Sequence, residues 1–256
     1  MGRNGWYRAI VGGTALCVVA IAVTGAAFVR RDVHAEYVKY LSGKDTITGY
    51  LAYPERKDPA PAVVVIFEIF GMSDFVRQTT EQLARDGFVA LAPDLLSRRG
   101  GTPPSTDEAR KLIAGLNPDT LTLDLDATVT HLKTLKAVRG DRIGVIGFCW
   151  GGGQSFRYAT NNPALRAYVV CYGPAPDAAA IARIHAKGLG VYAENDARID
   201  AGLTDVAAAV KQYAKDYRYT VYPGVGHGFL RSREKPEVAD SAWRTVVRFF
   251  REGLER

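Results

Sequence analysis

The stretch that decides the fold is Asp141-Arg-Ile-Gly-Val-Ile-Gly-Phe-Cys-Trp-Gly-Gly-Gly153, an apolar run that leads directly into a cysteine flanked by glycines. Gly147, Cys149 and Gly151 form the pattern Gly-x-Cys-x-Gly, which is typical of a nucleophile at a sharp turn from a strand into a helix. Such a turn needs small neighbours because the backbone of the nucleophile is strained there. The helix N-terminus that follows favours the thiolate form of the sulfur. The same residues also fit a buried, inert cysteine at a glycine-rich strand end, so the rest of the chain has to distinguish the two interpretations.

After residue 35 the chain alternates short β-rich runs with longer helical patterns. This alternation predicts an α/β domain over residues 36–256, with a mostly parallel sheet and helices on both faces. Tyr37–Leu41 and Ile47–Tyr53 predict an opening hairpin, and Ala62–Glu68 is a continuous apolar run typical of a central strand. The other expected strands are Phe88–Ala92, Leu165–Tyr172, Leu189–Ala193 and Arg218–Tyr222, and the expected helices are Phe75–Asp86, Thr106–Ala114, Leu121–Val138, Gly151–Ala159, Asp177–Ala186, Leu203–Lys215 and Glu237–Arg251. The Gly-, Pro- and Arg-rich stretch 97–118 has the position of a lid but is too short for a separate cap domain.

Residues 1–35 differ from the rest of the chain in composition. Residues 9–29 carry no charged side chain, and Arg3 and Arg8 precede them, as in an export signal. The run is long enough for an apolar helix that spans a bilayer, while Val33-His34-Ala35 offers a small-residue cleavage site before Glu36. We therefore expect a signal peptide or a membrane anchor in front of the domain. The flanking charge places the domain outside the cytoplasm, in the periplasm or an equivalent compartment, either free or tethered by residues 9–29.

The charged residues and cysteines exclude several classes of protein. The net charge is +6, and the four arginines and one aspartate among residues 1–35 account for half of it. The other Lys and Arg residues are scattered, so we expect no nucleic-acid partner. Beyond the apolar segment the chain has only Cys149 and Cys171, which make no disulfide framework but could pair with each other in an oxidising compartment. No cluster of His, Cys or Asp has the spacing of metal ligands, so we expect neither a metal nor another cofactor.

A cysteine nucleophile needs a base for the thiol proton and a group that orients the base. His227 follows a predicted strand near the end of the chain, and it is the histidine whose position suits that base. Glu194 and Asp196 follow the preceding predicted strand, at the sheet edge where the carboxyl ends of parallel strands meet. Asp196 is preferred over Glu194 as the orienting group, because aspartate has the shorter side chain. Asp200 is an alternative if the loop folds differently.

Four segments of the chain resemble the dienelactone hydrolase family of α/β-hydrolases, and the likeness covers most of residues 36–253. The matching segments are Phe-Glu-Ile-Phe-Gly at 67–71, Ala-Pro-Asp-Leu-Leu at 92–96, Gly-Phe-Cys-Trp-Gly-Gly at 147–152 and Tyr-Pro-Gly-Val-Gly-His-Gly-Phe at 222–229. The resemblance implies the α/β-hydrolase fold without a large cap domain. It also implies a catalytic triad of Cys149, His227 and Asp196.

The resemblance assigns further residues around the nucleophile. It places Glu68 beside Cys149, where the carboxyl group would hydrogen-bond the thiol and take its proton when substrate arrives. A carboxylate at the end of a buried strand needs such a partner, because burial of an unpaired charge is costly. The oxyanion hole would consist of the backbone amides of Trp150 and Ile69.

Two arginines match those with which relatives hold the carboxylate of dienelactone. They are Arg98, for which the neighbouring Arg99 is an alternative, and Arg231. Arginine suits this task because its planar fork binds a carboxylate through two parallel hydrogen bonds, although either residue could also be a solvated surface arginine. The resemblance thus implies a carboxymethylenebutenolidase-like enzyme that hydrolyses a small-molecule lactone or carboxylic ester through an acyl-cysteine intermediate. We also expect the protein to be a monomer.

Three alternatives stay open at this point. The chain could be a carboxylesterase or thioesterase of the same family with broad specificity. It could be a redox or binding protein with a disulfide between Cys149 and Cys171. It could also be a membrane-tethered scaffold whose site has lost its activity.

Overall fold

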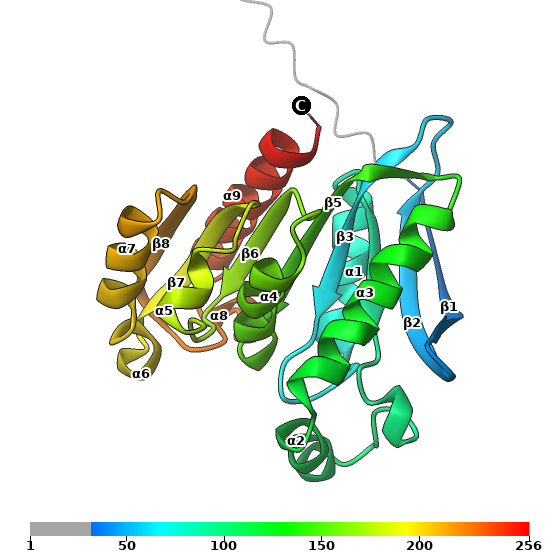
Figure 1. Ribbon diagram of the computed structural model, residues 1–256, viewed down its shortest axis with the longest axis horizontal. Helices are drawn as coiled ribbons and strands as arrows, with labels where there is room; N and C mark the ends of the chain where they lie inside the picture. Colours follow the sequence, from blue (N-terminus) through cyan, green and yellow to red (C-terminus); the bar gives the residue numbers. More distant parts are fainter. Residues whose placement is uncertain (1–31, 256) are drawn as a thin grey trace, which may run out of the picture. The chain divides into compact units, whose positions relative to one another are not determined.

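The strands of the computed structural model, which describes residues 32–255, form one sheet in the order β1-β2-β4-β3-β5-β6-β7-β8 (Figure 1). The strands are β1 (Val33–Ser42), β2 (Asp45–Pro54), β3 (Ala60–Ile66), β4 (Val89–Pro93), β5 (Val138–Phe148), β6 (Ala167–Cys171), β7 (Lys187–Asn195) and β8 (Tyr217–Gly226). β1 and β2 form the expected hairpin, and β2 also pairs antiparallel with β4. The pairs from β4 through β8 are all parallel. The prediction of a mostly parallel sheet is therefore confirmed.

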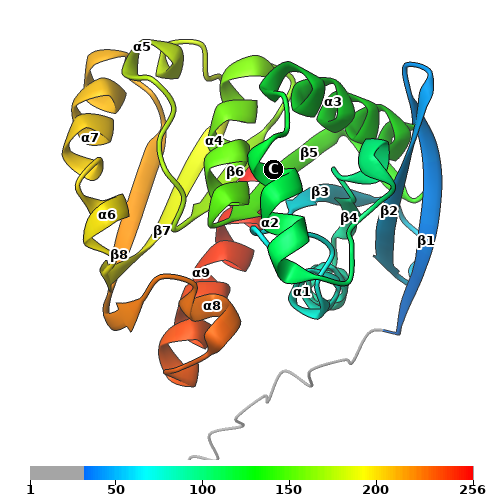
Figure 2. The ribbon, with the colours of Figure 1, turned by 90° about the horizontal axis from the view of Figure 1, so that it is seen from below.

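Helices cover both faces of this sheet, which also confirms the layered architecture. Figure 2 shows α3, α4, α5 and α7 on one face, with α1, α8 and α9 on the other. The helices are α1 (Asp74–Arg85), α2 (Thr106–Ala114), α3 (Pro118–Thr134), α4 (Trp150–Asn161), α5 (Ala178–Ile181), α6 (Ala197–Asp200), α7 (Leu203–Gln212), α8 (Phe229–Ser232) and α9 (Pro236–Leu254), and η1 (Ser97–Arg99) is a 3-10 helix. All seven residues of β3 are buried, as expected for a strand with helices on both sides.

Two expected helices differ most clearly from the observed ones. The helix expected over Leu121–Val138 begins earlier, because the side chain of Asn117 caps the amides of Asp119 and Thr120. It ends at Thr134, and Val138 already belongs to β5. The helix expected over Asp177–Ala186 shortens to α5, which ends at Ile181.

The expected N-terminal apolar helix lies outside the described residues. Among residues 32–255, no helix combines the length and the apolar character that a membrane span requires.

Candidate active site

The candidate nucleophile Cys149 lies between the end of β5 and the start of α4. Its φ angle of 55° falls in the left-handed region, which residues other than glycine rarely adopt. Two glycines make this turn possible, since a Cβ atom at Gly147 would lie 1.8 Å from the carbonyl oxygen of Gly151. A Cβ atom at Gly151 would lie 2.2 Å from the carbonyl oxygen of Phe67. The end of β3, the end of β5 and the first turn of α4 thus pack too closely for any side chain, and this packing holds Cys149 in its strained conformation.

The structure brings Cys149, His227 and Asp196 together from three elements. Nε2 of His227, in the turn after β8, lies 3.0 Å from Sγ of Cys149. Nδ1 of the same ring lies 2.5 Å from Oδ2 of Asp196, the residue after β7, which is 7% exposed. The hydrogen bond with Cys149 and, next, that with Asp196 raise the pKa of His227 to about 9, against the lowering effect of burial. A protonated imidazole at neutral pH beside a sulfur is an arrangement that stabilises a thiolate.

Within residues 32–255, neither of the other two candidate carboxylates is hydrogen-bonded to His227, whose carboxylate partner is Asp196. Glu194 accepts a hydrogen bond from the backbone amide of Gly224 at 2.7 Å. Asp200 lies in the short helix after Asp196, and burial and then the negative charge of Asp196 raise the pKa of Asp200. Of the three carboxylates, Asp196 is therefore the one that holds the imidazole of His227.

Glu68 lies two residues beyond β3 and is 2% exposed. Nε of Arg231 lies 2.9 Å from its Oε2, so the two side chains form an ion pair, but Oε2 accepts no hydrogen bond of good geometry. Burial raises the pKa of Glu68, while the positive charges of Arg231 and His227 lower it. The hydrogen bond expected between the Cys149 thiol and Glu68 is not formed. Sγ of Cys149 is instead hydrogen-bonded to Nε2 of His227.

The two amides expected in the oxyanion hole lie on neighbouring segments. Ile69 is in the turn after β3, and Trp150 is the first residue of α4. The rings of Phe67 and Trp150 stack with their centroids 5.8 Å apart, so these two segments are side by side. Within residues 32–255, neither amide donates to another backbone group. Both are thus available to an oxyanion.

The guanidinium of Arg98 is held by hydrogen bonds and ion pairs to other residues of the protein. Its Nε lies 3.1 Å from both carboxylate oxygens of Asp124, and its Nη2 lies 2.8 Å from Oδ1 of Asp124. The same guanidinium also bonds the carbonyl oxygen of Ser42 and pairs with Asp45. It therefore ties the turn between β1 and β2 to α3. This arrangement argues against the expected role in substrate binding, because the donors of Arg98 are already committed to the protein.

A different arginine lies near Arg231, and no motif in the sequence singles it out. The guanidinium carbon of Arg110, in α2, lies 5.2 Å from the ring centroid of Phe70, and that of Arg231 lies 5.0 Å from the same centroid. The side chain of Arg110 is half exposed, and its ion pair with Asp107 is a distant 3.7 Å. The only earlier indication was the position of α2 in the stretch expected to form a lid. Arg110 and Arg231 thus place two cations around one ring of the Glu-Ile-Phe-Gly segment.

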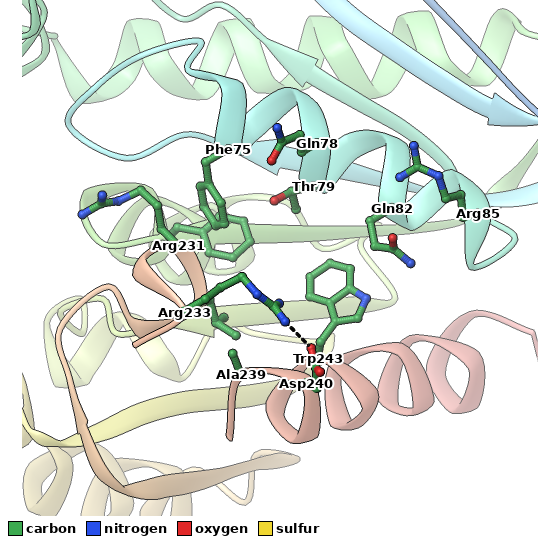
Figure 3. Close-up of a pocket in the computed structure, with 12 residues that line it drawn as sticks. Phe75, Gln78, Thr79, Gln82, Arg85, Arg231, Arg233, Ala239, Asp240 and Trp243 are labelled. Atoms are coloured by element: carbon green, nitrogen blue, oxygen red, sulfur yellow. Dashed lines mark hydrogen bonds and ion pairs between the residues drawn. The ribbon is translucent and has the colours of Figure 1, made fainter. Parts of the chain in front are cut away.

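A groove of about 620 Å³ adjoins the site between α1 and α9 (Figure 3). Arg231 and Phe148 belong to its lining, together with Phe75, Gln78, Thr79, Gln82, Arg85, Leu230, Arg233, Ala239, Asp240 and Trp243. In Figure 3 the guanidinium of Arg231 points away from Trp243 and out of the groove. None of the three residues of the candidate triad lines it.

Both cysteines of the described chain are free, so the alternative of a disulfide is not realised. Cys171, at the end of β6, is fully buried, and its carbonyl oxygen accepts a hydrogen bond from the amide of Cys149 at 3.0 Å. Residues 32–255 contain no group of three or more side chains that could hold a metal ion.

Comparisons with known proteins agree with this geometry. The model of the dienelactone hydrolase family matches residues 47–254. A protein of Methylorubrum extorquens with the provisional name carboxymethylenebutenolidase is 31% identical over 258 residues, which cover 94% of this chain and 89% of that protein. A Bradyrhizobium protein with the provisional name 2-oxo-3-(5-oxofuran-2-ylidene)propanoate lactonase is 31% identical and covers 79% of this chain and 88% of its own.

Comparison with solved structures indicates the same family. The crystal structure of a provisionally named dienelactone hydrolase from Klebsiella pneumoniae superimposes with a TM-score of 0.78 at 26% identity, over 86% of this chain and 98% of that one. The architecture is thus that of the α/β-hydrolases. The chain belongs to the dienelactone hydrolase family, which is a family of hydrolases.

Proposed function

We propose that the protein hydrolyses a lactone or carboxylic ester that bears a free carboxylate, through an acyl-cysteine intermediate. The single observation that carries the proposal is the chain of contacts from Cys149 through His227 to Asp196, with distances of 3.0 and 2.5 Å. A nucleophile, a base and a group that orients the base are the parts that acyl transfer requires.

The reaction follows from these contacts in two halves. The Cys149 thiolate attacks the ester carbonyl carbon, and the amides of Ile69 and Trp150 stabilise the oxyanion. The bond to the leaving oxygen then breaks, and protonated His227 donates the proton from Nε2 to that oxygen. In the second half, neutral His227 takes a proton from water, which attacks the thioester carbonyl carbon. The carbon–sulfur bond breaks, the acid leaves, and Cys149 and His227 return as thiolate and imidazolium.

Two arginines support the proposed class of substrate. Arg110 and Arg231 flank Phe70 at 5.2 and 5.0 Å and would together bind a substrate carboxylate beside a flat, unsaturated ring. A carboxylate there competes with Glu68 for Arg231, whose Nε is 2.9 Å from Oε2. The provisional names of two relatives, carboxymethylenebutenolidase and 2-oxo-3-(5-oxofuran-2-ylidene)propanoate lactonase, describe hydrolysis of unsaturated lactones that carry a carboxylate, which supports this class of substrate.

Export is part of the proposal. It is supported by the uncharged run at residues 9–29 and by the arginines that precede it. The domain would then act on substrates outside the cytoplasm.

The test is a Cys149→Ala variant with Cys171→Ala as its matched control, since the chain holds both cysteines in the same domain. Cys149→Ala should abolish hydrolysis of a carboxylate-bearing enol lactone, whereas Cys171→Ala should keep it. Iodoacetamide should label Cys149 in the wild type, and the lactone should slow this labelling. Turnover by Cys149→Ala at the wild-type rate would refute the nucleophile, and equal rates with methylated and free-acid substrates would refute the carboxylate site.

A further inference from the structure

The turn between β3 and α1 carries two parts of the candidate site. It includes Ile69, whose amide is expected in the oxyanion hole, and Phe70, whose ring lies near the guanidinium groups of Arg110 and Arg231. Neither Ile69 nor Phe70 belongs to a helix or a strand, and the amide of Ile69 donates to no other backbone group within residues 32–255. The position of that amide therefore depends on what fixes the turn around it.

Met72, three residues after Ile69, is held by side chains from two other segments. Its amide donates a hydrogen bond of 3.0 Å to the hydroxyl of Thr102, and its carbonyl oxygen accepts one of 2.7 Å from Arg77 of α1. Gly71 has a φ angle of 66°, and a Cβ atom there would lie 2.5 Å from Oγ1 of Thr102. Thr102 thus packs directly against the backbone of the turn and also bonds to it.

Thr102 is itself anchored to Asp94, the residue after β4. Its amide donates to Oδ2 of Asp94 at 2.8 Å, and its hydroxyl donates to Oδ1 at 2.9 Å. Asp94 is 8% exposed and also accepts a hydrogen bond from the amide of Leu96 at 3.0 Å, so its carboxylate is fixed. The hydroxyl of Thr102 gives its single proton to Asp94 and accepts from the amide of Met72 with a lone pair. It therefore bridges a fixed carboxylate and the turn.

Two glycines bring the chain from η1 to this position. Gly100 and Gly101 both have a φ angle of 94°, in the left-handed region, and the amide of Gly101 donates to the carbonyl oxygen of Leu96 at 3.0 Å. Thr102 follows them directly and belongs to the stretch 97–118 that was expected to form a lid. Its hydroxyl thus ties this stretch to the turn that carries Ile69.

We propose that Thr102 is a positioning residue that holds the turn after β3 so that the amide of Ile69 faces the oxyanion. This inference rests on the proposed function, because an oxyanion forms only when Cys149 attacks a carbonyl group. In that attack the sulfur–carbon bond forms, and the electron pair of the carbonyl π bond moves to the oxygen. A donor that is already in place stabilises this charge without rearrangement. Without the hydroxyl of Thr102, the amide of Met72 loses its acceptor and the turn loosens.

The test is Thr102→Val, which removes the hydroxyl and keeps the shape of the side chain. The matched control is Thr122→Val. Thr122 is half-buried like Thr102, and its hydroxyl also bridges two groups, since it donates to the carbonyl oxygen of Pro118 and accepts from Arg157 in α4. Neither of these partners belongs to the candidate site.

Thr102→Val should lower kcat about tenfold and leave KM nearly unchanged, for the free-acid lactone and its methyl ester alike, because both form the same oxyanion. The decrease is smaller than for a deleted donor, since the amide of Ile69 is displaced and not removed. Thr122→Val should keep the kcat of the wild type. Thr102→Ser keeps the hydroxyl and should restore kcat.

Two measurements separate a positioned amide from a change elsewhere. Hydrogen exchange at the amide of Met72 should become faster in Thr102→Val and stay the same in Thr122→Val. Phenyl trifluoromethyl ketone reports on the oxyanion without turnover, because the Cys149 thiolate adds to its carbonyl carbon and the electron pair moves to the oxygen. Its affinity should fall about tenfold in Thr102→Val.

Unchanged affinity for the ketone, or a rise in KM confined to the free acid, would overturn the role of Thr102. The proposal also falls if the wild type does not bind the ketone. If the wild type binds the ketone but hydrolyses no ester or lactone, the proposed function fails, and the ketone affinity of Thr102→Val still decides on Thr102.

Discussion

Replacement of Arg98 by alanine distinguishes a structural arginine from one that binds substrate. The side chain of Arg98 is 22% exposed and that of its partner Asp124 is 1% exposed, so the variant leaves a buried carboxylate without its cation. Removal of one member of a buried ion pair costs about 3–5 kcal/mol, and the partial exposure of Arg98 puts the expected loss near the lower value. For a chain of this size, a loss of about 3 kcal/mol lowers the melting temperature by about 6–12 °C.

The assay combines thermal denaturation with steady-state kinetics on a pair of substrates, one with a free carboxylate and one with its methyl ester. Arg98→Ala should melt early but change KM for both substrates equally. Arg99→Ala is the matched control, since Arg99 is the exposed neighbour, and it should stay within about 0.5 kcal/mol of the wild type. Asp124→Asn in the Arg98→Ala background should recover part of the lost stability, because it removes the uncompensated charge.

The opposite result would refute this reasoning. If Arg98→Ala melts with the wild type and raises KM only for the free carboxylate, Arg98 binds substrate after all. The network of Asp124, Asp45 and Ser42 would then have to open during the reaction.

The remaining predictions concern Arg110 and Asp196. Arg110→Gln removes a half-exposed cation, so it should raise KM for the carboxylate-bearing substrate about tenfold, by the loss of one charge-assisted contact, and leave the methyl ester and the melting temperature unchanged. Equal effects on both substrates would contradict this. Asp196→Asn should lower kcat about a thousandfold or more and move the pKa of His227 from about 9 toward 6.5, as measured by NMR titration of the imidazole, because it removes one of the groups that raise it. In the wild type the folded-state pKa of His227, about 9, is above the unfolded value of 6.5, so the protonated imidazole stabilises the fold fully below pH 6.5 and loses this effect as the pH rises to about 9. The melting temperature of Asp196→Asn should therefore change less than that of the wild type between pH 6.5 and about 9. The same pH dependence in both proteins would count against the assignment of Asp196.

Local patterns were sufficient to predict the parts of the site that depend on backbone geometry. The Gly-x-Cys-x-Gly segment predicts a strand-to-helix turn because only glycine fits at Gly147 and Gly151, and the structure has that turn. Strand alternation could not separate Asp196 from Glu194, since residues two positions apart in a strand face the same side. Their partners differ because the pairing of β7 with β8 is irregular between Ala193 and Asn195 and Asp196 lies beyond the end of β7. The order of the elements was sufficient to place a carboxylate and a histidine at this edge of the sheet, whereas the choice of the carboxylate depended on tertiary geometry.

Inferences about side chains in loops were less secure, because tertiary contacts decide where those side chains go. Arg98 and Arg110 both lie in the stretch expected to form a lid, and nothing in their neighbourhoods distinguishes them by residue type. The difference arises from distant partners: Asp45 and Asp124 take Arg98, whereas Phe70 lies beneath Arg110. No motif marks Thr102, which lies in the same stretch. Its hydrogen bonds with Asp94 and with the turn after β3 exist only because β3 and β4 lie side by side in the sheet.

The charges of the site explain why substrate binding and nucleophile activation would be coupled. In the free protein, Arg231 balances Glu68, and Asp196 balances protonated His227. His227 also lowers the pKa of Glu68, so the two groups stabilise each other's charged forms. A substrate carboxylate that binds Arg231 therefore leaves Glu68 with His227 as its nearest remaining cation, which strengthens the protonated form of the imidazole next to Cys149. A neutral ester has no carboxylate that could bind Arg231, so Arg231 would stay paired with Glu68. The ester would then have to react without this added stabilisation of the thiolate–imidazolium pair.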